Sequence, residues 1–380
     1  MVKLKMTVYY IMMITMITLA TGSYIFSRNK YIKNTWWIYI VLLFLILALR
    51  HPSMGYDLRY GSAYGYLGWF RRISYTDFKE LSMISSMSQF EFGYVLLNRV
   101  IGVFSHNEQV FIAVCTALSI LPFSLFIKRN SDYPLLSVII LIGLSSFLLY
   151  YSALRQTVAL GICVCSVKYI QEENLKKFLL CIATATAIHY SAIFFTVSYF
   201  AYHIQIGRRV RLISITFIPI LFALRKFLYP ILNVYSGDYV TGGEMSSGTV
   251  TFWIYYLIYV FCILLTLFCP KKYFKDGVFH IEDKRNQRIT IINGYFNIYF
   301  LASCCMIFQD VNPLSARLAA YYMFVLTALI PQILHIIKDR RLFYFMYFIL
   351  FVTFLFFGLN RLDEGSDSYA LSSPYRFFWQ

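Results

Sequence analysis

Long apolar runs, separated by short polar segments, make up most of the 380-residue chain. Most of these runs are long enough to cross a hydrocarbon core of about 30 Å as helices. The pattern predicts an all-α, polytopic transmembrane helix bundle with about 10 full spans, forming one integral membrane domain over residues 1–380. The runs lie at residues 6–26, 36–49, 109–127, 134–151, 155–170, 212–229, 251–269, 289–308, 316–337 and 342–359.

The apolar segment at residues 178–204 does not fit this scheme as a simple span. Basic residues flank both of its ends, and a single crossing would place the last two basic loops of the chain outside. Because basic loops favour the cytoplasmic side, we predict that the segment enters and returns as two half-helices broken near 188-IHYS-191. His189 would then lie deep inside, where broken backbone is tolerated only if protein or water covers it.

The basic residues also predict which side of the membrane each loop occupies. Placing most of the 34 Lys and Arg residues in the cytoplasm puts both termini outside and makes residues 50–108 a large outer segment. Within that segment, 91-EFGYVLLNRVIGVF-104 has apolar residues at helical spacing and is too short to span, so we expect an interfacial helix. The first run follows Lys3 and Lys5 as in a signal peptide, but its length favours a retained first span.

Composition supports a membrane protein and excludes several other classes. The chain is 59% hydrophobic, 19% aromatic and only 14% charged. Its net charge of +16 reflects topology rather than nucleic-acid binding, since no basic stripe is long enough to follow a phosphate backbone. The eight cysteines lie in or beside apolar runs without zinc-ligand spacing, so no metal site is expected.

Common catalytic motifs are missing from the sequence. There is no P-loop, GxGxxG, GxSxG or HExxH pattern, which disfavours nucleotide-driven transport and the usual hydrolases. No cofactor is therefore predicted.

Charged residues at the ends of apolar runs are the main candidates for function. Arg155 and Gln156 stand side by side at the start of a run, where a charge costs about 2.5–3.5 kcal/mol on insertion scales. Such residues usually face a polar cavity, although an arginine that snorkels to the interface is the alternative. Arg50 also lies at an outer span end and Arg317 just inside one, so the three could converge on one anionic ligand.

The order of five short motifs gives a resemblance to a known family. Arg50 follows the second run, and it is followed in turn by Glu-x-Gly-Tyr at 91–94, Arg-Gln at 155–156, His-x-Ser-Ala at 189–192 and Arg-Leu-x-x-Tyr at 317–321. This order resembles the EpsG-like branch of the Wzy-type polysaccharide polymerases over residues 50–331. In the first outer loop the sequence departs from the family's Gly-Thr-Asp, and Asp57 takes the place of the acid.

The resemblance implies a metal-independent glycosyltransferase at the periplasmic face of the bacterial inner membrane. Its substrate would be an oligosaccharide repeat unit carried on undecaprenyl pyrophosphate, polymerised into O-antigen, capsule or exopolysaccharide. Its partners would be this lipid-linked oligosaccharide and the bilayer, with a chain-length regulator of the membrane as a further candidate.

The candidate residues divide into two groups under this interpretation. Arg155, Arg317 and His189 are predicted to be catalytic, with the arginines stabilising the departing pyrophosphate. Glu91 and Asp57 are alternative bases, while His189 could instead cap the helix break. The predicted substrate-binding residues are Arg50, Asp57, Glu91, Gln156, Tyr321 and Arg376.

Two other functions stay open from the sequence. A ligase that transfers finished polysaccharide to lipid A core would need a similar donor, but the order of motifs favours a polymerase. A flippase or other carrier would predict symmetric halves with polar residues at the midplane, and the sequence has no such repeat.

Overall fold

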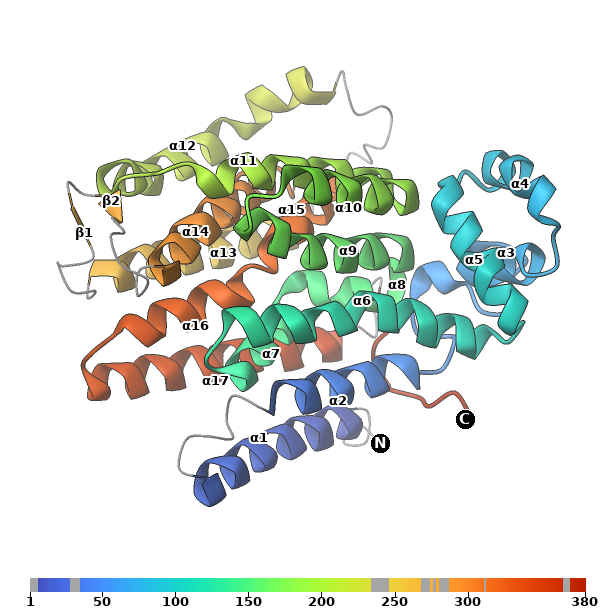
Figure 1. Ribbon diagram of the computed structural model, residues 1–380, viewed down its shortest axis with the longest axis horizontal. Helices are drawn as coiled ribbons and strands as arrows, with labels where there is room; N and C mark the ends of the chain where they lie inside the picture. The colour runs from blue at the N-terminus through green and yellow to red at the C-terminus, as the bar shows by residue number, and fades with distance from the viewer. Residues whose placement is uncertain are drawn as a thin grey trace. The chain divides into compact units, whose positions relative to one another are not determined.

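The computed structural model describes residues 6–27, 35–233, 246–267, 274–275, 278–279, 287–310, 312–364 and 370–380. Across these residues the regular structure is helical, apart from an antiparallel hairpin of β1 (Phe274–Lys275) and β2 (Val278–Phe279) (Figure 1). The predicted all-α class is therefore confirmed. Contacts divide the chain into a first unit, Met1–Thr196 with Leu350–Gln380, and a second unit, Val197–Ile349.

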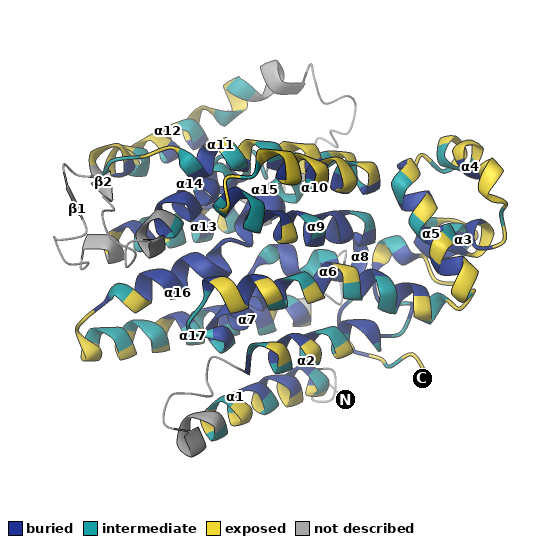
Figure 2. Ribbon diagram, in the orientation of Figure 1, coloured by how far each residue is buried: buried dark blue, intermediate teal, exposed yellow. Residues whose placement is uncertain are grey.

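The first unit is built on long helices that pack in sequence. Helix α9 packs against both α6 and α10, and α6 also packs against α2. Most of α9 is buried (Figure 2). The long helices are α1 (Thr7–Ser27), α2 (Trp36–Ala48), α6 (Glu108–Asn130), α9 (Leu154–Gln171), α10 (Leu175–Ile188) and the end of α17 (Arg340–Glu364).

Short helices complete the first unit. Three of them, α3, α4 and α5, pack on one another within residues 50–108 and are here called the α3–α5 lobe (Figure 1). The predicted interfacial helix at 91–104 is confirmed as a helix, α5. The short elements are η3 (Tyr56–Leu58), α3 (Gly65–Ile73), η4 (Phe78–Glu80), α4 (Leu81–Ser88), α5 (Phe92–Phe104), α7 (Pro134–Gly143), η5 (Ser145–Leu148), α8 (Leu149–Ser152) and η6 (Tyr190–Thr196).

Local sequence explains where several of these helices begin and how closely they pack. The side chain of Asn107 accepts a hydrogen bond from Gln109 N at 2.7 Å and caps α6. Proline, whose missing N–H is not needed there, begins α7 at Pro134. Gly161 lets α9 approach α6 closely, because a Cβ at this position would overlap the carbonyl of Leu118. The close approach at Gly161 holds α9, the helix that carries Arg155, against α6.

The predicted break near residue 189 is confirmed. Helix α10 ends at Ile188, His189 adopts an extended conformation with φ −154° and ψ 117°, and the 3-10 helix η6 follows. Whether the two halves enter and leave a membrane on one side stays a prediction.

Two segments predicted as spans are bent helix pairs. The run at 134–151 turns by 74° after Gly143, where a Cβ would lie 2.6 Å from the carbonyl oxygen of Phe354. The run at 316–337 bends by 42° between α15 and α16. There the Thr327 hydroxyl donates to the carbonyl of Phe324 at 2.7 Å, and Pro331 has no N–H to donate to the preceding turn.

The second unit is organised around α14. This helix packs against α11, α13, α15 and α16. Two asparagine side chains join α14 to the end of α11, because Asn297 donates to Ala201 O at 2.8 Å and Asn293 donates to Ile204 O at 2.9 Å. Its helices are α11 (Val197–His203), α12 (Arg208–Asn233), α13 (Ser246–Leu267), α14 (Gln287–Met306), α15 (Pro313–Met323), α16 (Leu326–Ile336) and the start of α17.

The ten predicted runs all correspond to helices or bent helix pairs, but the span count is not established. Among the described residues, α6 and α17 are long and apolar enough to cross a membrane, and the number rises to four if each bent pair is one span. Ten crossings, the outer position of residues 50–108 and the single membrane domain stay predictions.

Candidate functional site

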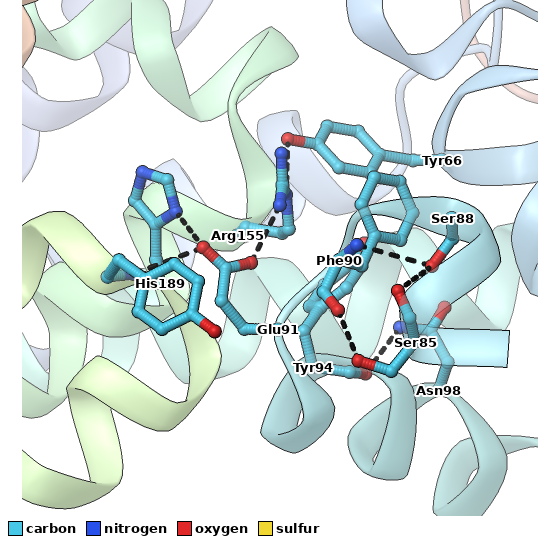
Figure 3. Close-up of polar contacts among 10 residues, drawn as sticks. Tyr66, Ser85, Ser88, Phe90, Glu91, Tyr94, Asn98, Arg155 and His189 are labelled. Carbon is cyan, nitrogen blue, oxygen red and sulfur yellow. Dashed lines mark hydrogen bonds and ion pairs between the residues drawn. The ribbon is translucent and has the colours of Figure 1, made fainter. Parts of the chain in front are cut away.

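Glu91 lies where the α3–α5 lobe meets α9 and α10, and both of its carboxylate oxygens are engaged. Arg155 Nη1 donates to Oε2 at 2.6 Å. His189 Nδ1 lies 2.8 Å from Oε1, and the backbone N–H of Tyr190 donates to the same oxygen at 3.1 Å (Figure 3). Three residues that are far apart in sequence, all predicted as site residues, therefore form one cluster.

Each member of the cluster comes from the end of a different helix. Glu91 directly precedes α5, Arg155 is the second residue of α9, and His189 directly follows α10. Gly93 makes the meeting possible, because a Cβ there would lie 2.5 Å from the carbonyl oxygen of Ala187 in α10. The close approach of α5 and α10 brings the carboxylate to the histidine.

Aromatic side chains hold the guanidinium of Arg155. Its Cζ lies 4.4 Å from the centroid of the Phe90 ring, and its Nε donates to the Tyr66 hydroxyl at 3.4 Å (Figure 3). Its second terminal nitrogen, Nη2, makes no hydrogen bond with any residue that the structure describes. The Arg155 side chain is 21% exposed and that of Glu91 only 4%. Glu91, Arg155, His189, Tyr66 and Phe90 are called the Arg155 site below.

The environment of Glu91 keeps its carboxyl group ionised. Burial by itself raises the pKa of Glu91. The hydrogen bond from His189, the charge of Arg155 and the backbone N–H groups outweigh this effect and lower the pKa to about 2. An ionised carboxylate can only accept, so His189 Nδ1 donates to it and Nε2 is left as the accepting nitrogen of the neutral ring.

His189 offers that accepting nitrogen to a ligand. Its side chain is 22% exposed. Figure 3 shows Nε2 directed away from Glu91, and no hydrogen bond to it is made within the described part of the chain. A histidine oriented by a buried carboxylate is an arrangement suited to accepting a proton.

Two further predicted residues lie close to this site in the chain. Gln156 follows Arg155 on α9 and is buried, with 2% of its surface exposed. Asp57 is half-buried in η3, in the loop that leads to Tyr66. Their predicted contacts with substrate stay predictions.

Arg50 belongs to a different and fully buried cluster, here called the Arg50 cluster. It donates to the carbonyl oxygens of Leu47, Met54 at 3.4 Å and Tyr151 at 3.3 Å, and to the hydroxyl of Thr116 at 3.4 Å. The residue is 0% exposed. The Arg50 guanidinium, which was predicted to bind substrate, therefore donates its hydrogen bonds to backbone and hydroxyl oxygens.

The C-terminal segment covers the Arg50 cluster. Arg50 and Phe377 form an antiparallel bridge, and His51 N donates to Arg376 O at 2.8 Å. The Arg376 side chain is exposed, so it stays a candidate for binding an anion.

Arg317 and Tyr321 lie on α15 in the second unit. Tyr321 is fully buried, whereas Arg317 is partly exposed. Their predicted convergence with Arg155 on one ligand stays a prediction.

Sequence reasoning missed three residues of the Arg155 site or its support. Tyr66 is one of 33 tyrosines and Phe90 one of 36 phenylalanines, so composition gave no reason to select them. Gly93 was visible within the Glu-x-Gly-Tyr motif, but its role depends on a contact with Ala187 that only the fold reveals.

Comparisons with known proteins identify the family of the chain. No curated protein and no solved structure matches the chain significantly. The model of the EpsG family, by contrast, matches residues 33–377, which include every residue of the Arg155 site and of the Arg50 cluster. The chain therefore belongs to the EpsG family.

Proposed function

We propose that this protein is a glycosyltransferase that joins lipid-linked oligosaccharide repeat units into a polysaccharide such as O-antigen or capsule. Membership of the EpsG family and the apolar helices suggest a membrane protein with a polysaccharide polymerase-like role. We place the reaction at the outer face of the bacterial cytoplasmic membrane, with undecaprenyl pyrophosphate as the carrier. The observation that carries the proposal is a carboxylate-oriented histidine beside a permanently charged arginine.

His189 is the base in this proposal. Its Nε2 takes the proton of an acceptor hydroxyl while the hydroxyl oxygen attacks the anomeric carbon of the donor sugar. Glu91, which is too acidic to be an effective base itself, keeps the ring in the required tautomer and stabilises the imidazolium that forms. This assigns the base to His189 rather than to Glu91 or Asp57.

Arg155 stabilises the leaving group. The bond between the anomeric carbon and the pyrophosphate oxygen breaks, and its electron pair leaves with the lipid pyrophosphate. Nη1 is held by Glu91 and the guanidinium plane by Phe90, so Nη2 is already oriented to donate to that oxygen. Because the Arg155 side chain is already ordered, little entropy is lost in orienting it during the reaction.

The other predicted residues take supporting roles in the proposal. Arg317 stays predicted as a cation for the pyrophosphate, because that group carries more negative charge than one arginine neutralises. Gln156, Asp57 and Arg376 contact the rest of the substrate.

A product ladder from purified protein tests the proposal. Detergent-purified protein mixed with lipid-linked repeat units should form a ladder of polymers, and His189→Gln should lower its rate by about 10²–10⁴-fold. His106→Gln is the matched control, since His106 stacks on Tyr75 at 4.0 Å outside the Arg155 site. A wild-type protein that moves the lipid-linked unit across a vesicle membrane without forming a ladder would be a carrier, and the proposal would be wrong. Transfer of finished polysaccharide to lipid A core instead would identify a ligase.

A further inference from the structure

The loop at residues 56–66 presents three exposed tyrosines next to the Arg155 site. Tyr56, Tyr60 and Tyr64 are 56%, 55% and 63% exposed. The fourth tyrosine of the loop, Tyr66, is buried, and its hydroxyl accepts the hydrogen bond from Arg155 (Figure 3). Large aromatic rings exposed together on a short polar loop require an explanation other than packing.

One end of this loop is anchored to the end of α8 and the other to the start of α9. The backbone N–H of Tyr56 donates to the hydroxyl of Ser152 at 2.9 Å, three residues before Arg155. At the other end, Tyr66 contacts Arg155 itself at 3.4 Å. The three exposed tyrosines therefore lie on a loop that starts at a contact with Ser152 and ends at Tyr66 of the Arg155 site.

The loop has a built conformation. Gly65 has φ +80°, and a Cβ there would lie 2.7 Å from Cβ of Arg59, so the turn needs glycine. Arg71 donates to the carbonyl of Ser62 at 2.5 Å, and Tyr64 N donates to the hydroxyl of Ser62 at 3.1 Å. Because the backbone is already ordered, the tyrosines can bind a ligand with little further loss of entropy.

Polar groups surround the exposed rings. The Tyr60 ring contacts the ring of His51 edge-on at 5.1 Å, and the guanidinium of Arg59 lies 6.0 Å from the Tyr56 ring. His51 is in turn bonded through its backbone to Arg376, whose side chain is exposed. Burial and the charge of Arg376 lower the pKa of His51, so its ring is neutral near pH 7. Flat apolar faces beside neutral and cationic hydrogen-bonding groups suit a sugar ring, which has C–H faces and hydroxyl edges.

We propose that Tyr56, Tyr60 and Tyr64 form a carbohydrate subsite that holds sugar rings of the repeat-unit oligosaccharide beside Arg155. The inference rests on the proposed function for the identity of the sugar-bearing substrate. Lipid is a poorer occupant, because the residues between the tyrosines are mostly polar or small, and the one large apolar residue among them, Leu58, is buried. A subsite of this kind binds the non-reacting sugars and directs the reacting one to His189.

Binding of lipid-free oligosaccharide tests the subsite separately from polymerisation. The probe is the repeat-unit oligosaccharide released by mild acid from the lipid-linked pool of the producing cells, titrated into full-length protein in detergent. Each Tyr→Ala change in the subsite should weaken binding by about two- to tenfold, and each Tyr→Phe change should leave it nearly unchanged because the ring is kept. Tyr75→Ala is the matched control, since Tyr75 is 73% exposed but lies outside the loop.

The outcomes separate this inference from the proposed polymerase activity. Oligosaccharide binding that depends on the three tyrosines supports the subsite even if no ladder forms. A triple alanine variant that binds as tightly as the wild type, or no binding by the wild type at millimolar oligosaccharide, overturns it. Should the triple variant not fold, the single pair Tyr60→Ala and Tyr60→Phe decides. Normal binding together with loss of stable insertion into lipid nanodiscs would assign the tyrosines to the membrane surface instead.

Discussion

Arg50 and Arg155 both lie beside the ends of apolar helices in the same unit, yet their surroundings are opposite. Arg50 is fully buried and donates to backbone carbonyls and one hydroxyl. None of the acidic side chains in the described ranges contacts it. Arg155 is partly exposed, is paired with Glu91, and keeps Nη2 available for a ligand.

Under the proposed function, the difference separates a structural arginine from one that acts on the substrate. The Arg50 guanidinium donates to Leu47 at the end of α2, to Met54 in the following turn and to Tyr151 in α8. It therefore holds three parts of the chain together. The Arg155 guanidinium has a carboxylate that orients it and also orients His189. The partners of the two side chains, rather than their charge or depth, therefore distinguish the roles.

The largest expected effect comes from removing the carboxylate of Glu91, which the Arg155 site has and the Arg50 cluster lacks. Glu91→Gln no longer holds the tautomer of His189 or stabilises its imidazolium, so we expect the polymerisation rate to fall by about 10²–10⁴-fold. Glu108→Gln is the control, because that carboxylate pairs at 3.0 Å with Arg71, whose side chain is 46% exposed. A Glu91→Gln variant with a normal rate would remove the distinction between the two arginines.

Removing the guanidinium of Arg50 should affect folding instead. Arg50→Met leaves buried carbonyl oxygens without a donor, which should lower the free energy of unfolding by about 2–5 kcal/mol. Thermal unfolding in detergent and the amount of protein in the membrane measure this. Arg155→Met should be clearly less destabilising, and equal losses of stability in the two variants would contradict the comparison.

A smaller effect is expected from a substitution that separates α5 from α10 and changes no polar side chain. Gly93→Val places methyl groups against the carbonyl of Ala187, which should shift Glu91 away from His189 and lower the rate by about tenfold, the equivalent of about 1.4 kcal/mol. Gly22→Val is the control, since no atom lies within 4 Å of a Cβ built there. If both variants polymerise equally well, the close approach is not needed for the site.

The smallest expected effect is a pH dependence of the stability of the fold, which arises from Glu91 in the Arg155 site. The pKa of Glu91 is about 2 in the folded protein, below its ordinary value, so its ionisation stabilises the fold above about pH 4.5. That contribution is lost as the pH falls from 4.5 towards 2. The difference in thermal midpoint between wild type and Glu91→Gln should narrow as the pH falls from 4.5 to 3.5. A difference that stays the same at pH 3.5 would show that Glu91 is not held ionised.

The sequence predicted the helices well because each long apolar run can satisfy its backbone only as a helix. It also located the break at His189, since basic residues on both sides of one run are incompatible with a single crossing. The bends after Gly143 and at Phe324 were missed, because they depend on a helix contact and on a side-chain hydrogen bond within the run.

The candidate site was predicted residue by residue but not as a cluster. Glu91, Arg155 and His189 were all selected, yet their contact requires the approach of Gly93 to Ala187, which no local pattern encodes. For the same reason Arg50 could not be told from Arg155, since its partners are mostly backbone carbonyls that every residue possesses.

The most direct test is the polymer ladder formed per folded molecule by two matched variants, Arg155→Lys and Arg50→Lys. A lysine cannot keep two separate donors in the guanidinium plane, so Arg155→Lys should be present at normal abundance but form polymer about ten- to a hundredfold more slowly. Arg50→Lys should be less abundant, while each folded molecule polymerises at close to the wild-type rate. A normal ladder from Arg155→Lys, or an equal loss of rate per folded molecule in both variants, would contradict the assignment of the reaction to the Arg155 site.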